Sequence, residues 1–111
     1  MNNAEFGTYA TLEIKLKEFA KIIEETYKED FKNIKIDYEI NYTKSKYKPL
    51  QFNIIIKMNF NYVNGGFELQ IHKNGIDFIN EYTFIISDVI RFINYKIKIT
   101  EALYGRSNKI I

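Results

Sequence analysis

The single histidine, His72, is the first residue of this chain to test for catalysis, because histidine most often transfers protons near neutral pH. It alternates with Gln70 and Glu68 in a stretch whose other residues are mostly apolar, so the three side chains are expected on one polar strand face. A general base needs a positioned partner, and an open polar face offers no cleft to position one. We therefore interpret His72 as a surface histidine and expect no catalytic residues.

Acidic residues and glycines supply no second catalytic motif. Asp37 and Glu39 share the face of another expected strand, where alternating solvated charges are the commoner explanation of such a pair. One histidine, no cysteine and scattered carboxylates form no cluster of metal ligands. Gly65 and Gly66 precede an expected strand instead of a helix, so they lack the helix N-terminus of a phosphate loop. We expect no metal, no cofactor and no enzymatic activity.

Basic residues gather in two places and suggest a different chemistry, the binding of phosphates. Residues 43–48 interleave three lysines with one tyrosine, so the lysines could neutralise phosphates while the ring stacks on a base. Residues 91–111 carry five basic residues against one acid, a local net charge of +4. Nucleic-acid binding is therefore the alternative function. Its candidate residues are Lys44, Lys46, Tyr47, Lys48, Arg91 and Lys98.

The overall composition weakens that alternative. Ile, Lys, Asn, Phe and Tyr make up 64 of the 111 residues, and lysine outnumbers arginine 14 to 2. All five residue types use AT-rich codons, so the simplest source is a bacterium, phage or plasmid with an AT-rich genome. A lysine–tyrosine cluster then reflects codon usage as well as function. The formal net charge of +2 is too small to imply a polyanionic partner.

Three stretches with a period of two predict the strands that position these residues. Apolar side chains alternate with mostly polar ones across residues 34–42, 51–62 and 67–72. Successive side chains of a strand point to opposite faces, so one face of the sheet is expected to be covered and the other open. The aromatic residues share the covered face. The open face is therefore no base-stacking platform of the kind used by sheets that bind single-stranded RNA.

Apolar residues at three- and four-residue steps predict a helix on each side of these strands. The first helix is expected from about Tyr9 to Lys32. The second is expected from about Glu81 to Tyr104, with Asn80 as its N-cap and Gly105 as its stop. Within the second segment, residues 95–99 also alternate as a strand would, so both interpretations remain open there.

Together these elements predict a two-layer α+β domain. Asn74-Gly75 is a signal for a two-residue hairpin, so a short fourth strand is expected at Ile76–Ile79. Short turns favour an antiparallel meander of three or four strands, with an N-terminal and a C-terminal helix on one face. The order of elements is similar to that of the double-stranded-RNA-binding domain. That family places a lysine-rich motif at the start of its last helix, whereas residues 79–83 contain an acid and no lysine.

Length and composition also bound the domain and its compartment. A chain of 111 residues is one domain by length, so residues 1–111 are expected to fold as a unit, with residues 1–7 and 106–111 flexible. The absence of cysteine favours a reducing, cytoplasmic compartment. No apolar run approaches the roughly 18 residues of a membrane span, so we expect no membrane association.

The second expected helix carries more apolar surface than packing on a sheet requires. A second apolar stripe flanks its main one, and together they span roughly 240°, where little more than 100° is usual. The second stripe consists of Phe84, Phe92, Tyr95 and Ile99. Either the first helix covers it, or a second copy or another protein does, because large exposed apolar patches mark interfaces.

The predicted function is therefore that of a small, non-enzymatic protein-interaction module. Its expected partner is a protein, either a host target or a second copy in a homodimer. Small size and AT-rich composition add the hypothesis of an inhibitor of a host defence protein, encoded by a phage or mobile element. Anti-CRISPR proteins are often small single domains without catalytic residues. That analogy rests on size and composition, and immunity proteins and antitoxins fit them equally well.

Overall fold

The computed structural model describes residues 1–104, which form three helices and one sheet. The elements in chain order are α1 (Asn3–Tyr27), β1 (Asn33–Thr43), β2 (Gln51–Asn61), β3 (Gly66–Asn74), α2 (Gly75–Asn80) and α3 (Tyr82–Tyr104). The strands form an antiparallel meander in the order β1-β2-β3. This arrangement confirms the predicted α+β fold with an N-terminal and a C-terminal helix.

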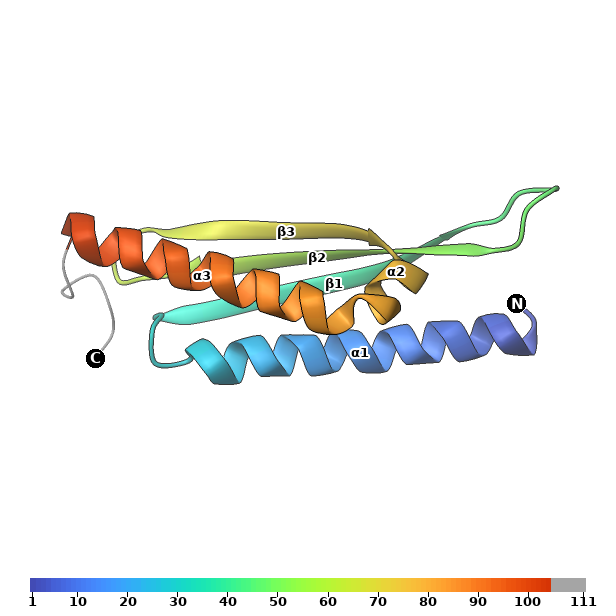
Figure 1. Cartoon of the computed structure of the whole chain (residues 1–111), viewed down its shortest axis with the longest axis horizontal. Coiled ribbons are helices and arrows are strands. Elements are labelled where there is room, and N and C mark those ends of the chain that lie inside the picture. Colours follow the sequence, from blue (N-terminus) through green and yellow to red (C-terminus); the bar gives the residue numbers. More distant parts are fainter. Residues whose placement is uncertain (105–111) are drawn as a thin grey trace.

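The sheet has one covered and one open face, and both long helices lie on the covered face (Figure 1). Tyr38, Ile56 and Ile71 occupy one cross-strand row of that face. The burial of the central strand follows the predicted alternation, since Ile56 and Met58 are fully buried whereas Lys57 between them is exposed. In the central strand, the period-two pattern therefore predicted which side chains are buried.

Helix α1 contributes one apolar stripe to this core. Side chains three and four positions apart lie on the same side of a helix, so they reach the sheet together. The buried members of the stripe are Leu12, Leu16, Phe19, Ile23 and Tyr27. Phe31, in the connection after the helix, packs its ring 5.1 Å from the ring of Phe60 on the sheet. The end of the two-layer structure is thereby closed with aromatic side chains.

The first helix begins earlier than predicted. It starts at Asn3, not near Tyr9, so residues 3–7 are part of the helix and the predicted start is wrong. The reason is a capping box: the Glu5 amide donates to Oδ1 of Asn2 at 2.8 Å, and the Asn2 amide donates to Oε1 of Glu5 at 2.9 Å. The helix also ends earlier, at Tyr27 instead of Lys32.

The predicted fourth strand at Ile76–Ile79 is wrong, because those residues belong to helix α2. Asn74 does not form a hairpin turn but caps this helix, its Oδ1 accepting from the amides of Ile76 at 2.9 Å and Asp77 at 3.3 Å. At Gly75 an added Cβ would lie 2.8 Å from a methyl group of Leu12. Gly75 therefore allows α2 to pack closely against α1. The Asn-Gly pair alone does not distinguish this role of glycine from its role in a hairpin turn.

Helix α3 runs continuously from Tyr82, so residues 95–99 are helical and the alternative of a strand is excluded. Asn80 was predicted to be the N-cap of the second helix, but it is the last residue of α2. The helix stop expected at Gly105 and the flexibility expected of residues 106–111 concern residues outside the described part of the chain. Within residues 1–104, no helix is both long and apolar enough to cross a membrane.

The molecule is elongated, with principal extents of 55 × 21 × 21 Å. Its radius of gyration is 16.6 Å; a compact chain of this length would have about 13 Å. The long axis follows the strands and both long helices, and the β1–β2 loop projects at one end (Figure 1). Sites at the two ends of the molecule are therefore far apart.

Candidate interaction surface

Helix α3 has one buried face and two flanks with different surroundings. Ile85, Val89 and Ile93 on the buried face are at most 8% exposed. One flank meets α1, where the Tyr27 hydroxyl lies 2.7 Å from Oδ1 of Asn94. The other flank adjoins β3. Two members of the predicted second stripe, Phe84 and Phe92, line the space between this flank and β3. Tyr95 borders the hollow on the α1 side of the helix.

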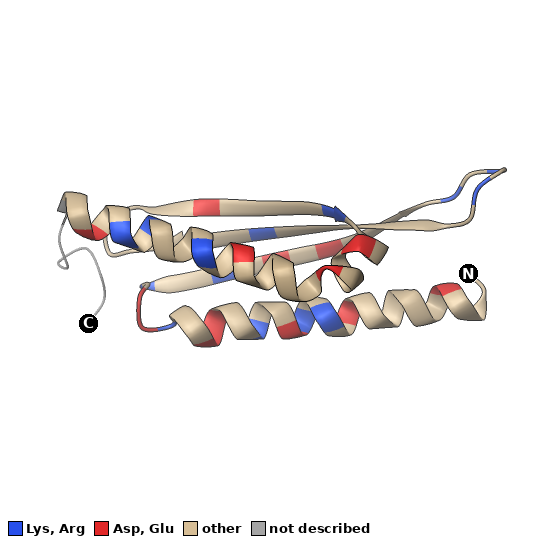
Figure 2. Cartoon of the chain, in the orientation of Figure 1, with Lys and Arg blue, Asp and Glu red and all other residues tan. Residues whose placement is uncertain are grey.

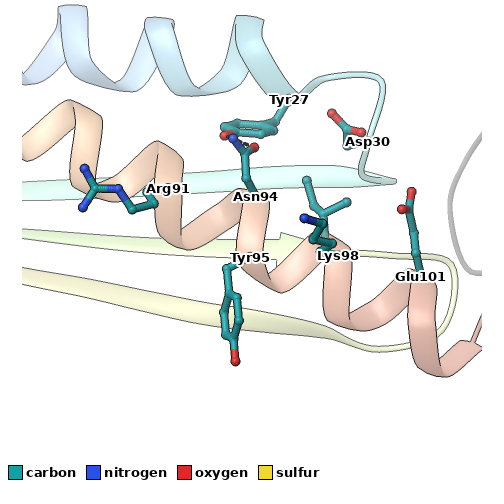
Figure 3. A pocket seen from close by; sticks show the side chains of 8 residues that line it. Tyr27, Asp30, Arg91, Asn94, Tyr95, Lys98 and Glu101 are labelled. Atoms are coloured by element: carbon teal, nitrogen blue, oxygen red, sulfur yellow. Dashed lines mark hydrogen bonds between the residues drawn. The ribbon is translucent and has the colours of Figure 1, made fainter.

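The β3 flank remains largely open to solvent. Phe84 is 74% exposed, Tyr95 60% and Phe92 36%, while Ile99 is half-buried. Helix α1 does not cover them. Figure 3 shows Tyr27 on one side of α3 and the Tyr95 ring pointing away from it, on the opposite side. The sequence offered two explanations for this stripe, and the structure does not show the first, in which α1 packs against it.

A groove of about 290 Å³ separates this flank from strand β3. Leu69 and Ile71 of β3 form one wall of the groove, and Phe84 and Phe92 of α3 line the other. Phe92 partly closes one end, since its ring packs edge-on against Phe67 with the centroids 6.3 Å apart. The groove is therefore an apolar channel between a helix and a strand.

Charged side chains border the groove at the start of α3. Lys73 and Glu81 form an ion pair of 3.3 Å, and Asp88 also lines the groove. At the other end, Nζ of Lys96 lies 5.5 Å from the centroid of the Phe92 ring. An apolar centre with charged residues around it is the usual anatomy of a protein interface.

Strand β3 adds a hydrogen-bonding edge to this surface. In the sheet that the structure describes, β3 pairs with β2 only and so is an outer strand. The outward amide and carbonyl groups of an outer strand are available to another extended chain. The sequence did not predict that the surplus stripe would lie beside this edge, because nothing in the spacing of α3 specifies which strand it will adjoin.

A second hollow, of about 500 Å³, lies on the α1 flank of α3. Arg91 and Lys98 line it together with Asp30 and Glu101, so its charge is mixed. Arg91 is 3.4 Å from the carboxylate of Asp88. Two residues of the alternative nucleic-acid site therefore share one hollow, but acidic groups accompany them there.

The Tyr27 side chain borders the same hollow and is held as the neutral phenol. Burial, and secondarily the negative charge of Asp30, raise the pKa of Tyr27 above its usual value of 10.0. Its hydroxyl is within 3.1 Å of the Ile90 carbonyl oxygen as well as close to Asn94. This tyrosine is a structural link between helices α1 and α3.

The lysine loop lies at the opposite end of the molecule from the basic part of α3 (Figure 2). Tyr47 at the loop tip is 86% exposed, and Nζ of Lys46 lies 5.6 Å from the centroid of its ring. Because the long axis of the molecule measures 55 Å, the six candidate nucleic-acid residues form two separate groups and not one site.

His72 lies on the open sheet face in a row of polar side chains. Its Nε2 is 3.2 Å from Oε1 of Gln70, whose amide nitrogen donates to Glu68 at 2.8 Å. All three residues are exposed. Among residues 1–104 there is also no group of three or more potential metal ligands.

Comparisons with known proteins add no functional assignment. No protein-family profile matches the chain, and neither a curated protein nor a solved structure shows significant similarity to it.

Proposed function

We propose that this protein is a non-enzymatic interaction module that binds a protein partner through the β3 flank of α3. The observation that carries the proposal is the exposed aromatic row beside an apolar groove and a free strand edge. Phe84 and Phe92, which line the groove, are its central contact residues. Tyr95 and Ile99, farther along α3, complete the proposed contact.

The energetics of burial support a protein as the occupant. Covering one large apolar side chain contributes roughly 1.5–3 kcal/mol. Phe84 and Tyr95 keep most of their surface in water, so they retain most of that free energy for an interface. Aromatic anchors near the centre of a contact supply much of the affinity in protein complexes.

The proposal extends to a class of partner. Small size and an AT-rich composition support a phage or mobile-element protein that inhibits a host protein, such as a component of host defence. Such an inhibitor needs a binding surface and no catalytic group. The absence of cysteine supports a cytoplasmic location for this encounter.

The test compares two glutamate substitutions at exposed apolar residues. Phe84→Glu places a charge in the β3 flank, and Ile14→Glu places one on α1, where Ile14 is 64% exposed. Both variants should fold as the unmodified protein does, as judged by circular dichroism and thermal melting. The proteins captured from a lysate of an AT-rich bacterial host are compared by quantitative mass spectrometry, and the affinity of each is then measured with purified protein.

We expect Phe84→Glu to weaken binding of a captured protein at least tenfold and Ile14→Glu to leave it unchanged. Equal binding by the two variants, together with an unaffected Tyr95→Glu variant, would rule out the β3 flank as the contact surface.

Nucleic-acid binding remains a second candidate because of the exposed ring of Tyr47 among the loop lysines. A basic site of this kind would lose affinity steeply as the salt concentration rises. Replacing Lys44, Lys46 and Lys48 by Glu would then abolish retention of DNA or RNA. No retention of either polymer by the unmodified protein at low salt would end this candidate.

A further inference from the structure

We infer that one partner of this surface is a second copy of the chain, joined through β3 to the same strand of its partner across a two-fold axis at Gln70. The inference rests on the proposed function, because it names an occupant for the same groove. It predicts a continuous six-stranded antiparallel sheet with all four long helices on one face.

The length of β3 defines the register of this pairing. Gln70 is the central residue of β3, which runs from Gly66 to Asn74. An antiparallel pair centred on Gln70 therefore aligns the whole strand with its copy. Such an isologous contact is closed, so it forms a dimer and does not propagate into a filament.

The open face of β3 is complementary to itself in this register. Glu68 lies opposite the partner's His72, and the partner's Glu68 lies opposite His72. An imidazole N–H can donate to a carboxylate, so the dimer gains one favourable cross-strand pair on each side of the axis. At the axis Gln70 faces the partner's Gln70, and amide side chains can donate and accept simultaneously. These side chains are exposed in the single chain and can reorient.

The centre of the covered face is also complementary in this register. Leu69 lies opposite the partner's Ile71 and the partner's Leu69 opposite Ile71, so apolar side chains meet twice. Both residues line the groove. The two-fold axis is perpendicular to the sheet, so the α3 helices of both copies lie on the same face. Phe84 and Phe92 thereby border an apolar space that the copy's own β3 flank can fill.

Neighbouring registers are less favourable. Moving the axis to Leu69 or to Ile71 keeps the faces in phase but pairs Glu68 or His72 with Gln70, which breaks the carboxylate–imidazole pairs. A slip of a single residue places Leu69 opposite the partner's Gln70, because adjacent side chains of a strand occupy opposite faces.

The other outer strand does not have this property. The central residue of β1 is Tyr38, and full overlap of β1 with a copy would place Asp37 opposite the partner's Glu39 on both sides of the axis. Like charges directly opposite each other destabilise a strand pair. The charges thus favour β3, the edge beside the groove, over β1.

The decisive experiment is a charge exchange measured by sedimentation equilibrium. His72→Glu creates two carboxylate–carboxylate pairs that flank the axis, and we expect the dimer Kd to rise about 2- to 30-fold, as two cross-strand pairs imply. Adding Glu68→Lys to that variant creates two lysine–glutamate pairs and should restore the original Kd. The matched control is Asn53→Glu, which adds a carboxylate to the same exposed face but on the central strand β2.

A crosslink tests the register separately. The chain contains no cysteine, so a Gln70→Cys variant carries a single thiol. A short bis-maleimide should join two Gln70→Cys chains efficiently, since the two side chains meet at the axis. The control Asn53→Cys, one strand farther from the axis, should be joined only weakly.

Several results would overturn the dimer. A chain that stays monomeric up to about 1 mM would contradict the dimer, because its self-association would be too weak to form the proposed interface. Equal Kd values for His72→Glu and the unmodified chain, or crosslinking of Asn53→Cys as fast as Gln70→Cys, would equally contradict the pairing. A monomer that still loses a captured protein on Phe84→Glu would leave the proposed function standing without this partner.

Discussion

The Tyr27 hydroxyl shows how one polar atom positions the two helices that form the covering layer. It lies within hydrogen-bond distance of Oδ1 of Asn94 and of the Ile90 carbonyl oxygen. A carbonyl in mid-helix that accepts an additional side-chain donor fixes the axial position of α3 relative to α1. The exposed β3 flank is thereby held in place from the opposite side of its helix.

Replacing Tyr27 by Phe removes the hydroxyl and keeps the ring. We expect a loss of about 0.5–1.5 kcal/mol in the free energy of unfolding, the usual contribution of one hydrogen bond. Urea denaturation measures it. Tyr95→Phe is the matched control, because Tyr95 is 60% exposed, and its stability should not change.

Tyr82 predicts how stability depends on pH at alkaline values. Burial, followed by the negative charge of Glu18, raises the pKa of Tyr82 to about 12 from 10.0. Between these values the unfolded chain loses the phenolic proton while the folded chain keeps it. The free energy of unfolding should be at its full value below pH 10 and decrease as the pH rises toward 12.

Urea denaturation at several alkaline pH values checks this prediction with Tyr82→Phe, which lacks the titrating group. The variant should lose less stability over the same pH interval than the unmodified chain. Tyr47→Phe is the control, since Tyr47 is 86% exposed. Identical pH dependence of all three proteins would contradict the assignment.

At the scale of elements, the short helix α2 decides how the chain leaves the sheet. Phe78 belongs to the segment expected to form a fourth strand, and it is fully buried in α2 instead. The turn of helix brings the chain back over the sheet, whereas a fourth strand would have paired with β3. Helix α2 therefore leaves the β3 edge available.

Asn74→Ala removes the side chain that caps α2 and should reduce the free energy of unfolding by about 1 kcal/mol. Asn74→Asp retains an oxygen acceptor at the same position and should recover most of the loss. Thermal and urea denaturation compare the two variants. Equal stabilities of Asn74→Ala and the unmodified chain would show that the cap contributes nothing.

At the scale of the whole molecule, an elongated two-layer domain must shield its core from water at the ends as well as between its layers. The ring of Phe31 lies 5.0 Å from that of Tyr62 and 5.7 Å from that of Phe67. This cluster joins the α1–β1 connection to β3 across the end of the sheet. It also supports Phe67, on which Phe92 of the proposed interface rests.

Phe31→Ala should cost about 3–5 kcal/mol, because it leaves a cavity among rings that the surrounding strands cannot fill. Chemical denaturation gives the value. Ile14→Ala, at a position 64% exposed, should stay within about 0.5 kcal/mol of the unmodified protein. A cost of less than about 1 kcal/mol for Phe31→Ala would show that the cluster is not well packed.

Much of the fold followed from local periodicity. The alternation around Ile56 predicted its strand and its burial, and the three- and four-residue steps around Phe19 predicted α1. The ends of elements were less well predicted. The start of α1 depends on the capping box of Asn2 and Glu5, which lies outside the apolar stripe that predicted the helix. Asn74-Gly75 is compatible with either a hairpin turn or a helix cap.

The sequence alone determined the two layers, the core face of each strand and the surplus of apolar side chains on α3, because each follows from the period of one element. Tertiary structure decided where that surplus lies. Which flank of α3 contacts α1 depends on how the helices cross the sheet, and the crossing depends on contacts such as that of Tyr27 with Asn94, 67 residues apart. The structure accordingly left Phe84 and Tyr95 exposed beside β3 and separated the two basic groups along the length of the molecule.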